Sequence, residues 1–225
     1  MKHDKQLLLC SLILASGAVQ AADGGSFYEG IGVGTASYDL HLTEADRLLP
    51  FKGPDGHSIS QDQYTFDTND QVLQLFAGYR FNRYVAVELS LADLGAVDRD
   101  GTFNVTNGGP LNGTLISHTS IETRGIGAAV LGIWPITPAI DVYGRAGLFN
   151  WSIRAPFTVV SNGNPFLTGK STDHGTDPFI GVGAAYKWDI FSVRVEYQRY
   201  KFSRPFNVTN DANANVLTAS LLYNF

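Results

Sequence analysis

The amino-acid sequence predicts an all-β protein, an eight-stranded antiparallel up-and-down transmembrane β-barrel. Three observations support this prediction: apolar and polar residues alternate with a period of two, short and long connections alternate along the chain, and aromatic residues gather beside the short connections. Only 16% of the 225 residues are charged, against about a quarter in soluble domains. A bundle of spanning helices is excluded, because after the first twenty residues no apolar run approaches the ~18 residues that each spanning helix needs.

Residues 1–21 are predicted to be a secretory signal peptide that is cleaved after Ala21. A basic start precedes an apolar stretch from Leu7 to Ala15, and small residues precede the cut. A membrane anchor is the alternative, but this stretch has about half the length that a spanning helix needs. We therefore expect export of the chain, with 22–225 forming the barrel domain. Cys10 would leave with the signal peptide, so no disulfide is expected.

Eight segments carry the alternation and are predicted to be the barrel strands. They are 26–40, 70–81, 84–97, 118–134, 139–155, 177–188, 191–203 and 215–225. Most of them reach the ~9–11 residues that a tilted strand needs to cross the hydrocarbon core of a bilayer. We therefore expect each segment to cross a membrane once.

The connections between these segments are of two kinds. The tight turns are 82–83, 135–138 and 189–190, and the long polar connections are about 41–69, 98–117, 156–176 and 204–214. Bacterial outer-membrane barrels have this asymmetry, with short periplasmic turns and long extracellular loops. A soluble barrel of the lipocalin type shares the meander, so the choice depends on which face is apolar.

The two faces of the predicted strands differ in size and polarity. Between residues 191 and 198, Phe, Val, Val and Tyr alternate with Ser, Arg, Glu and Gln, and residues 27–34 alternate large residues with glycines. Eight strands enclose a lumen just wide enough for side chains, so the small and polar face fits the inside. The aliphatic face is then outside, where it would contact lipid.

Aromatic residues at the strand ends beside the short turns support the membrane interpretation. Such rings form a girdle at the level of the lipid headgroups, whereas aromatic packing in a soluble core would scatter them along the strands. The predicted girdle consists of Phe27, Tyr79, Phe81, Tyr84, Trp134, Tyr186, Trp188, Phe191, Tyr223 and Phe225.

Six charged residues are predicted to face the lumen and to form an interior charge network. They are Arg80, Glu88, Asp141, Arg145, Arg194 and Glu196. Three acids therefore meet three bases, and because a lone buried charge costs several kcal/mol, these groups should pair. Structural neutralisation is favoured over catalysis. We expect Glu88 to pair with Arg194 across the interior.

Several segments carry a family resemblance. Residues 78–89 (GYRFNRYVAVEL), 93–95 (DLG) and 194–198 (RVEYQ) closely resemble the transmembrane domain of the outer-membrane protein A (OmpA) family. Residues 27–34 (FYEGIGVG) look like the first strand of that family, and 142–147 (VYGRAG) like the fifth. The resemblance covers nearly the whole exported chain. It implies an eight-stranded barrel in the outer membrane of a Gram-negative bacterium, with an interior closed by charged networks.

The resemblance also bears on single residues. Glu88, Arg145, Arg194 and Glu196 match interior charges of the family, whereas two other interior charges of the family fall on Leu131 and Ala185. Because Leu131 and Ala185 carry no charge, the interior charges have no alternative ion-pair partners at these positions. The resemblance therefore does not imply a gate that opens by switching ion pairs. The segment 221–225 (LLYNF) resembles the C-terminal signal of such barrels, which implies contact of Phe225 with the barrel-assembly machinery.

Other chemistry has little support in the sequence. His118, Ser120 and Glu122 would share one face of a strand, but they lie in a polar segment, so no catalytic residue is assigned. The remaining histidines lack metal-ligand spacing, and we expect neither a metal nor another cofactor. A net charge of -5 without a basic cluster argues against a nucleic-acid partner.

The predicted function is that of a non-enzymatic outer-membrane barrel with a structural or surface role, a closed polar lumen and long extracellular loops. The alternatives are a small porin-like diffusion channel and, in a third class, a lipid A-modifying enzyme. The expected partners are outer-membrane lipid, lipopolysaccharide and the barrel-assembly machinery. An apolar belt is compatible with a monomer or a weak dimer.

Overall fold

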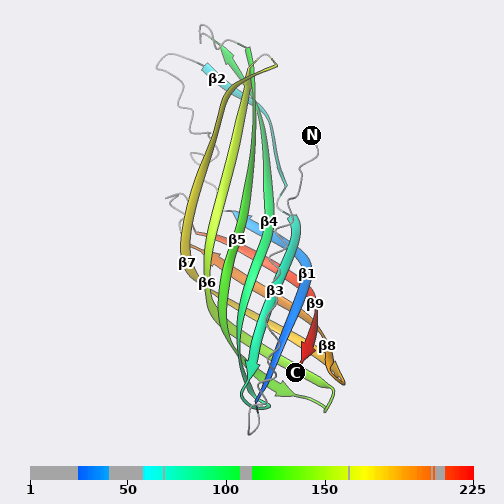
Figure 1. The fold of residues 1–225 in the computed structure, drawn as a ribbon. Helices are drawn as coiled ribbons and strands as arrows, with labels where there is room; N and C mark the ends of the chain where they lie inside the picture. The colour runs from blue at the N-terminus through cyan, green and yellow to red at the C-terminus, as the bar shows by residue number, and fades with distance from the viewer. Residues whose placement is uncertain are drawn as a thin grey trace.

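The computed structural model describes residues 25–40, 58–67, 69–106, 113–161, 163–203, 205 and 211–225. The described residues form nine antiparallel strands (Figure 1). They are β1 (Ser26–Leu40), β2 (Ser58–Asp67), β3 (Asn69–Arg80), β4 (Val85–Thr106), β5 (Gly113–Pro135), β6 (Ile140–Ser161), β7 (Asn164–Trp188), β8 (Phe191–Phe202) and β9 (Ala212–Asn224). The predicted signal peptide, 1–21, lies outside the described residues.

Eight of these strands close into a ring. The order β4-β3-β1-β9-β8-β7-β6-β5 is completed by pairing of β5 with β4, which confirms the predicted eight-stranded antiparallel barrel. Closure pairs the backbone N–H and C=O groups of every strand with those of two neighbours, which is the arrangement that a β-sheet needs in hydrocarbon. No helix in the described part of the chain has the length and apolarity required to cross a bilayer.

The predicted long loops are partly wrong. β4 and β5 continue through most of 98–117, β6 and β7 through most of 156–176, and β2 lies inside the predicted connection 41–69. The polar composition of these segments marks the exit of the chain from hydrocarbon, not the end of a strand, because polar side chains in water do not interrupt backbone pairing. Of the connection 204–214, the structure describes 205 and 211–214, where β9 has already begun.

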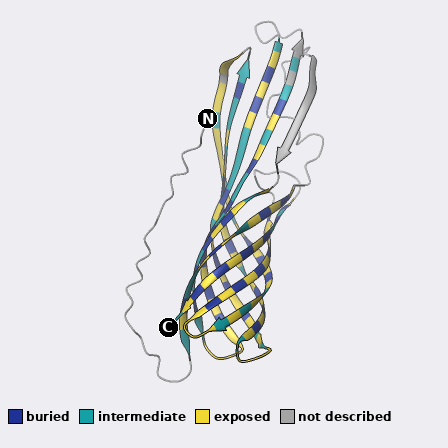
Figure 2. Cartoon of the chain, turned by 90° about the vertical axis from the view of Figure 1, so that its right-hand side faces the viewer, coloured by how far each residue is buried: buried dark blue, intermediate teal, exposed yellow. Residues whose placement is uncertain are grey.

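The continuing strands form an open sheet above one side of the barrel, called here the extension (Figure 2). It consists of the distal parts of β4, β5, β6 and β7 together with β2, which pairs with β4. β7 pairs with β6 from Asn164 onward but with β8 only from Phe179, so β8 ends at the barrel rim. Among the described residues, β7 therefore pairs only with β6 over residues 164–178, and β2 pairs only with β4, so these two strands are the outer strands of the extension.

A β-bulge turns β4 from the barrel into the extension. The β4–β5 register shifts between Asp93 and Ala96, and Gly95 has a φ of 82°, a conformation that glycine adopts without a Cβ penalty. Asp70 Oδ2 accepts the Ala96 N–H at 2.7 Å, which fixes the bulge to β3. Below the bulge β4 pairs with β3, and above it with β2.

The outer face of the barrel is an apolar belt of defined height. On β5 it runs over nine residues, from Ile126 to Trp134, and the outward Val130 is 55% exposed. At ~3.3 Å per residue and a tilt of ~40°, this corresponds to about 20 Å along the barrel axis, close to the ~25 Å apolar band of outer-membrane barrels. The next outward residue, Arg124, pairs with Asp93 at 3.0 Å, so the surface becomes polar there.

The ten residues of the predicted girdle lie at the end of the barrel with the short turns. Two runs of neighbouring rings are in contact, with centroids 4.7 to 6.2 Å apart. One run joins Phe27, Tyr79 and Phe81, and the other joins Tyr186, Trp188, Phe191, Tyr223 and Phe225. Tyr84 lies in the same β3–β4 turn as Phe81, and Trp134 precedes the turn between β5 and β6; they are 48% and 73% exposed.

Two lysine substitutions on the outer face of β5 test the height of this belt. Val130→Lys places a charge at its middle and should lower the free energy of unfolding by about 2–4 kcal/mol. Ile116→Lys is the matched control, because Ile116 is 49% exposed on the extension, and its effect should stay within about 0.5 kcal/mol. Urea unfolding in lipid vesicles measures both. Equal effects would contradict the placement of the belt.

Candidate functional site

The centre of the barrel lumen holds four charged side chains in a closed ring of ion pairs. Arg145 Nη2 contacts Glu88 Oε1 at 2.8 Å, and Arg145 Nη1 contacts Glu196 Oε1 at 2.9 Å. Arg194 Nη1 lies 2.8 Å from Glu88 Oε2 and 3.8 Å from Glu196 Oε2. The four side chains are at most 6% exposed and are called here the central quartet. The expected Glu88–Arg194 pair is one of its contacts.

Two tyrosines complete the coordination of the carboxylates. Tyr28 Oη donates to Glu88 Oε2 at 3.1 Å, and Tyr143 Oη donates to Glu196 Oε2 at 2.6 Å. Both rings also face the Arg194 guanidinium, whose Cζ lies 5.1 Å from the Tyr143 ring centroid. Charge-balanced ion pairs and charged hydrogen bonds compensate the cost of burying four ionised groups.

Inward glycines make room for these tyrosines. A Cβ on Gly78 would lie 2.2 Å from the Tyr28 ring, and a Cβ on Gly183 would lie 2.4 Å from the Tyr143 hydroxyl. Tyr28 of β1 therefore lies over Gly78 of β3, and Tyr143 of β6 lies over Gly183 of β7. The glycine-rich inner face that the sequence predicts is the packing surface for these two rings.

Beyond the quartet, on the side of the extension, three aromatic rings fill the lumen. Phe179 and Tyr200 are stacked with centroids 4.9 Å apart, and Phe149 meets Tyr200 at 4.8 Å. All three are 1% exposed and are called here the aromatic plug. Phe179 also contacts the quartet, because its ring centroid is 5.1 Å from Arg145 Cζ.

A hydrogen-bonded carboxylate lies at the upper rim, above the plug. Asp177 accepts hydrogen bonds from Trp151 Nε1 at 2.8 Å and from the backbone N–H and hydroxyl of Ser203 at 2.8 and 2.6 Å. These three donors compensate the burial of the carboxylate, whose residue is 8% exposed. Asp177 thus joins β6 and β7 to the end of β8.

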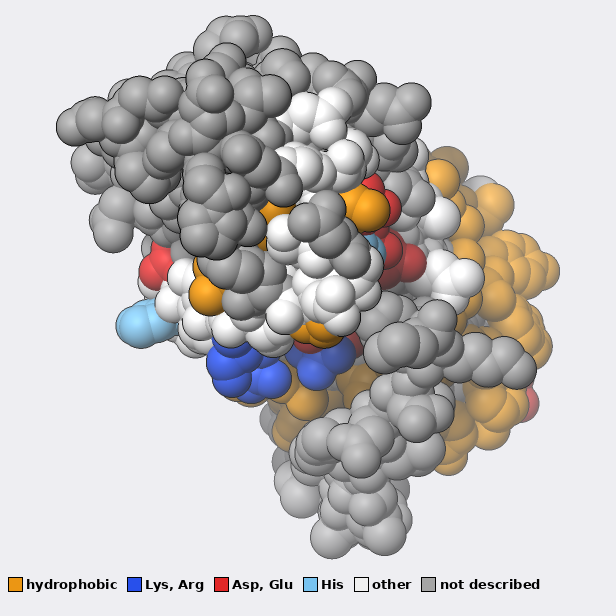
Figure 3. Space-filling model, turned by 90° about the horizontal axis from the view of Figure 1, so that it is seen from above, with side chains coloured by type: hydrophobic (Ala, Val, Ile, Leu, Met, Phe, Trp, Pro, Cys, Tyr) orange, Lys and Arg blue, Asp and Glu red, His pale blue; other side chains and the backbone are white. Residues whose placement is uncertain are grey.

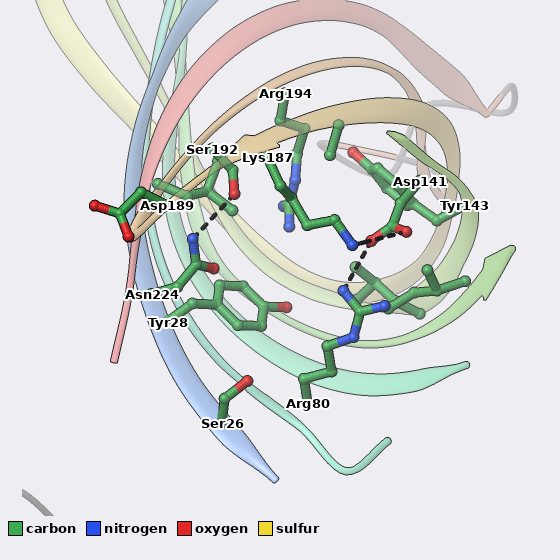
Figure 4. A pocket seen from close by; sticks show the side chains of 14 residues that line it. Ser26, Tyr28, Arg80, Asp141, Tyr143, Lys187, Asp189, Ser192, Arg194 and Asn224 are labelled. Atoms are coloured by element: carbon green, nitrogen blue, oxygen red, sulfur yellow. Dashed lines mark hydrogen bonds and ion pairs between the residues drawn. The ribbon is translucent and has the colours of Figure 1, made fainter. Parts of the chain in front are cut away.

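At the opposite end of the lumen, a cavity of about 330 Å³ adjoins the short turns (Figure 4). Asp141 Oδ2 contacts Arg80 Nη1 at 2.8 Å and Lys187 Nζ at 3.0 Å. Leu131 and Ala185, the two positions without the charges of the resembled family, also line this cavity. We call it the vestibule.

The structure divides the predicted interior charges into two layers. Glu88, Arg145, Arg194 and Glu196 form the quartet, whereas Arg80 and Asp141 lie at the vestibule. Sequence reasoning missed Lys187 as the second partner of Asp141, although it shares the inward alternation of Gly183 and Ala185. It also missed Phe179 and Tyr200, which continue the inward alternation of Gly181 and Gln198.

Among the described residues, the predicted neighbours His118, Ser120 and Glu122 do not come together as a hydrogen-bonded triad. His118 Nδ1 lies 2.5 Å from Asp100 Oδ1 on the outer face of the extension, and the two side chains are 50% and 58% exposed. Within the described part of the chain, His118 makes no hydrogen bond to Ser120, and no three His, Cys, Asp or Glu side chains are placed to hold a metal ion. A nucleophile needs its base within hydrogen-bond reach.

A double-mutant cycle tests the energetic coupling within the quartet. Glu88→Ala and Arg194→Ala should each lower the free energy of unfolding by about 3–5 kcal/mol, because each leaves a buried charge without its partner. The double variant should lose clearly less than the sum of the two, with a coupling of at least about 1 kcal/mol. Urea unfolding in vesicles gives the values. As a control, Arg154→Ala on the exposed outer face of β6 should add independently to Glu88→Ala, and strict additivity of the quartet pair would contradict the coupling.

Comparison with known proteins gives the family. The structure of Neisserial surface protein A is similar, with 14% sequence identity and a TM-score of 0.52, which supports the fold. The match covers 90% of this chain and 99% of the Neisserial chain. Ail of Yersinia pestis is also similar: the match covers 88% of this chain and 98% of Ail, with 16% identity and a TM-score of 0.46. For the N-terminal β-barrel domain of Pseudomonas aeruginosa OprF the match covers 88% of this chain and 97% of that domain, with 13% identity and a TM-score of 0.39. No curated protein matches. A model of the outer membrane protein beta-barrel domain matches residues 7–225, and the chain belongs to this family.

Proposed function

We propose that this outer-membrane barrel is a non-enzymatic protein with a closed lumen, and that its role is structural and surface-facing. The observation that carries the proposal is the pair of layers across the lumen, the central quartet and the aromatic plug. Residues 22–225 would be the exported barrel, reached after cleavage of a signal peptide, and the short turns would face the periplasm, as in other barrels of this kind.

Closure is supported by the geometry of both layers. The quartet joins β4, β6 and β8 across the lumen through contacts of 2.8 to 2.9 Å. The plug adds three rings that are 1% exposed and come from β6, β7 and β8. A hydrated ion moving through the barrel would have to separate buried ion pairs and then displace packed rings. The diffusion-channel alternative would require both layers to move.

The surface role is supported by the extension. Five strands stand above the apolar belt, and seen from that end Lys and Arg side chains gather on one side of the described surface (Figure 3). On the outer face, Arg154 of β6 is paired with Thr172 of β7, so Lys170 and His174 are its diagonal neighbours, and on its other side it is paired with Glu122 of β5.

This basic group faces the space that lipopolysaccharide headgroups would occupy. Arg154 lies six residues beyond Leu148, the last exposed apolar residue of β6, which corresponds to about 15 Å above the hydrocarbon at a tilt of ~40°. Arg154 and Lys170 carry one positive charge more than Glu122 balances, and phosphate groups of lipopolysaccharide at that height would be natural counter-ions for it. Lipopolysaccharide is therefore the lipid partner that we propose.

Two further parts of the proposal concern assembly and catalysis. Phe225 is 56% exposed and packs its ring 4.8 Å from Tyr223, so its outer face is available to the barrel-assembly machinery. Lipid A modification has less support, because no described residue places a nucleophile within hydrogen-bond reach of the pair formed by His118 and Asp100.

Planar-bilayer recording tests the closed lumen. Purified, refolded protein should give no stable, discrete conductance, because both layers occlude the lumen. Heat-modified mobility of the same sample on gels shows that the inserted protein is folded, which separates a closed barrel from failed insertion. Discrete, reproducible conductance steps from the folded protein would contradict the proposal and favour the diffusion channel.

A further inference from the structure

The vestibule differs from the central quartet in its charge balance. In the quartet two guanidinium groups meet two carboxylates, so the layer is neutral. In the vestibule Arg80 and Lys187 both contact a single carboxylate, Asp141. That side chain is only 4% exposed, so the surplus of one positive charge lies in a partly enclosed space.

The other acidic residue of the lining does not balance this surplus. Asp189 belongs to the turn between β7 and β8, where it has a φ of 51°, and it is exposed. Figure 4 shows its carboxylate directed away from Asp141 and Lys187. Among the described residues, no ion pair joins Asp189 to a cation of the vestibule. Its charge is therefore screened by solvent at the mouth.

Lys187 is the cation of the vestibule whose hydrogen-bond donors are not all used. Arg80 donates not only to Asp141 but also to the backbone carbonyls of Asn82 and Arg83, at 3.2 and 2.8 Å, so it is committed to the β3–β4 turn. Among the described residues, Lys187 Nζ contacts only the two oxygens of Asp141, at 3.1 and 3.0 Å, and its side chain is 30% exposed. An ammonium group has three donors, and one carboxylate does not use them all.

The remaining lining adds polar groups and sufficient room. Ser192 accepts a hydrogen bond from Asn224 Nδ2 at 3.0 Å, and Arg194 lines the inner end of the cavity with 6% of its side chain exposed. The Nε of this buried guanidinium has no hydrogen-bond partner among the described residues. A volume of about 330 Å³ equals that of roughly eleven liquid waters, enough for a small hydrated ion.

We propose that the vestibule is a binding site for a small oxyanion, a phosphate or a carboxylate group, with Lys187 as its principal ligand. The surplus positive charge selects an anion, and the directional N–H and O–H donors select oxygen acceptors. A lysine acts on such a group as a mobile point charge, which fits the cavity better than a rigid fork. This site is independent of whether the lumen conducts.

Nuclear magnetic resonance titration of the refolded barrel in an uncharged maltoside detergent tests the site. Inorganic phosphate should cause saturable shifts of the backbone amide signals of Ser26, Lys187 and Ser192, all on the lining. Acetate in a parallel titration distinguishes the two chemistries: shifts with both ions indicate a general oxyanion site, and shifts with one ion alone indicate a site selective for that group.

Matched variants make the test specific. Lys187→Gln should weaken binding at least tenfold and should still fold, because Asp141 keeps Arg80 as a balanced partner. Lys201→Gln removes the same charge from the exposed end of β8, at the other end of the barrel, and should bind like the unaltered protein. The proposal is overturned if neither ion gives saturable shifts at the lining, if Lys187→Gln binds normally, or if Lys201→Gln weakens binding equally.

Discussion

The structure depends on one constraint: hydrocarbon offers no water to an unpaired backbone, so every strand in the belt needs two neighbours. Pairing of β4 with β5 satisfies this constraint by closing the ring, and the extension shows where it ceases to apply. Above the belt, among the described residues, β7 pairs with β6 alone over residues 164–178, which an aqueous environment tolerates because water can hydrogen-bond the backbone at a sheet edge. The end of the ring and the end of the apolar belt therefore coincide.

Closure with eight strands also determines what the inside can hold. The centre of the lumen is too narrow for bulk water, so the side chains there pair with one another. A neutral quartet and stacked rings fill this part, whereas at the vestibule, where the lumen opens, two cations share one carboxylate. Gly78 and Gly183 are part of the same solution, because only their missing Cβ atoms let Tyr28 and Tyr143 reach the carboxylates.

Much of this could be predicted from the sequence, and the errors have physical causes. Alternation identified all eight ring strands and six inward charges, although not Lys187, because period two directly reflects which face a residue takes. It did not predict where β5 begins or where β6 ends, because polar residues indicate contact with water but do not determine the backbone conformation. The stacking of Phe179 on Tyr200 depends on the β7–β8 register, and a slip of one residue would turn either ring outward.

The central claim is that the aliphatic face of this barrel contacts lipid. Its most direct test is the accessibility of single nitroxide labels in bilayers, placed one at a time at the outward positions Leu89, Val182 and Val195 and, for comparison, at Ile116 on the extension. The first three positions should be accessible to oxygen and protected from a water-soluble nickel reagent, and Ile116 should show the reverse. Nickel accessibility at all four positions, as for a water-soluble barrel, would contradict the account.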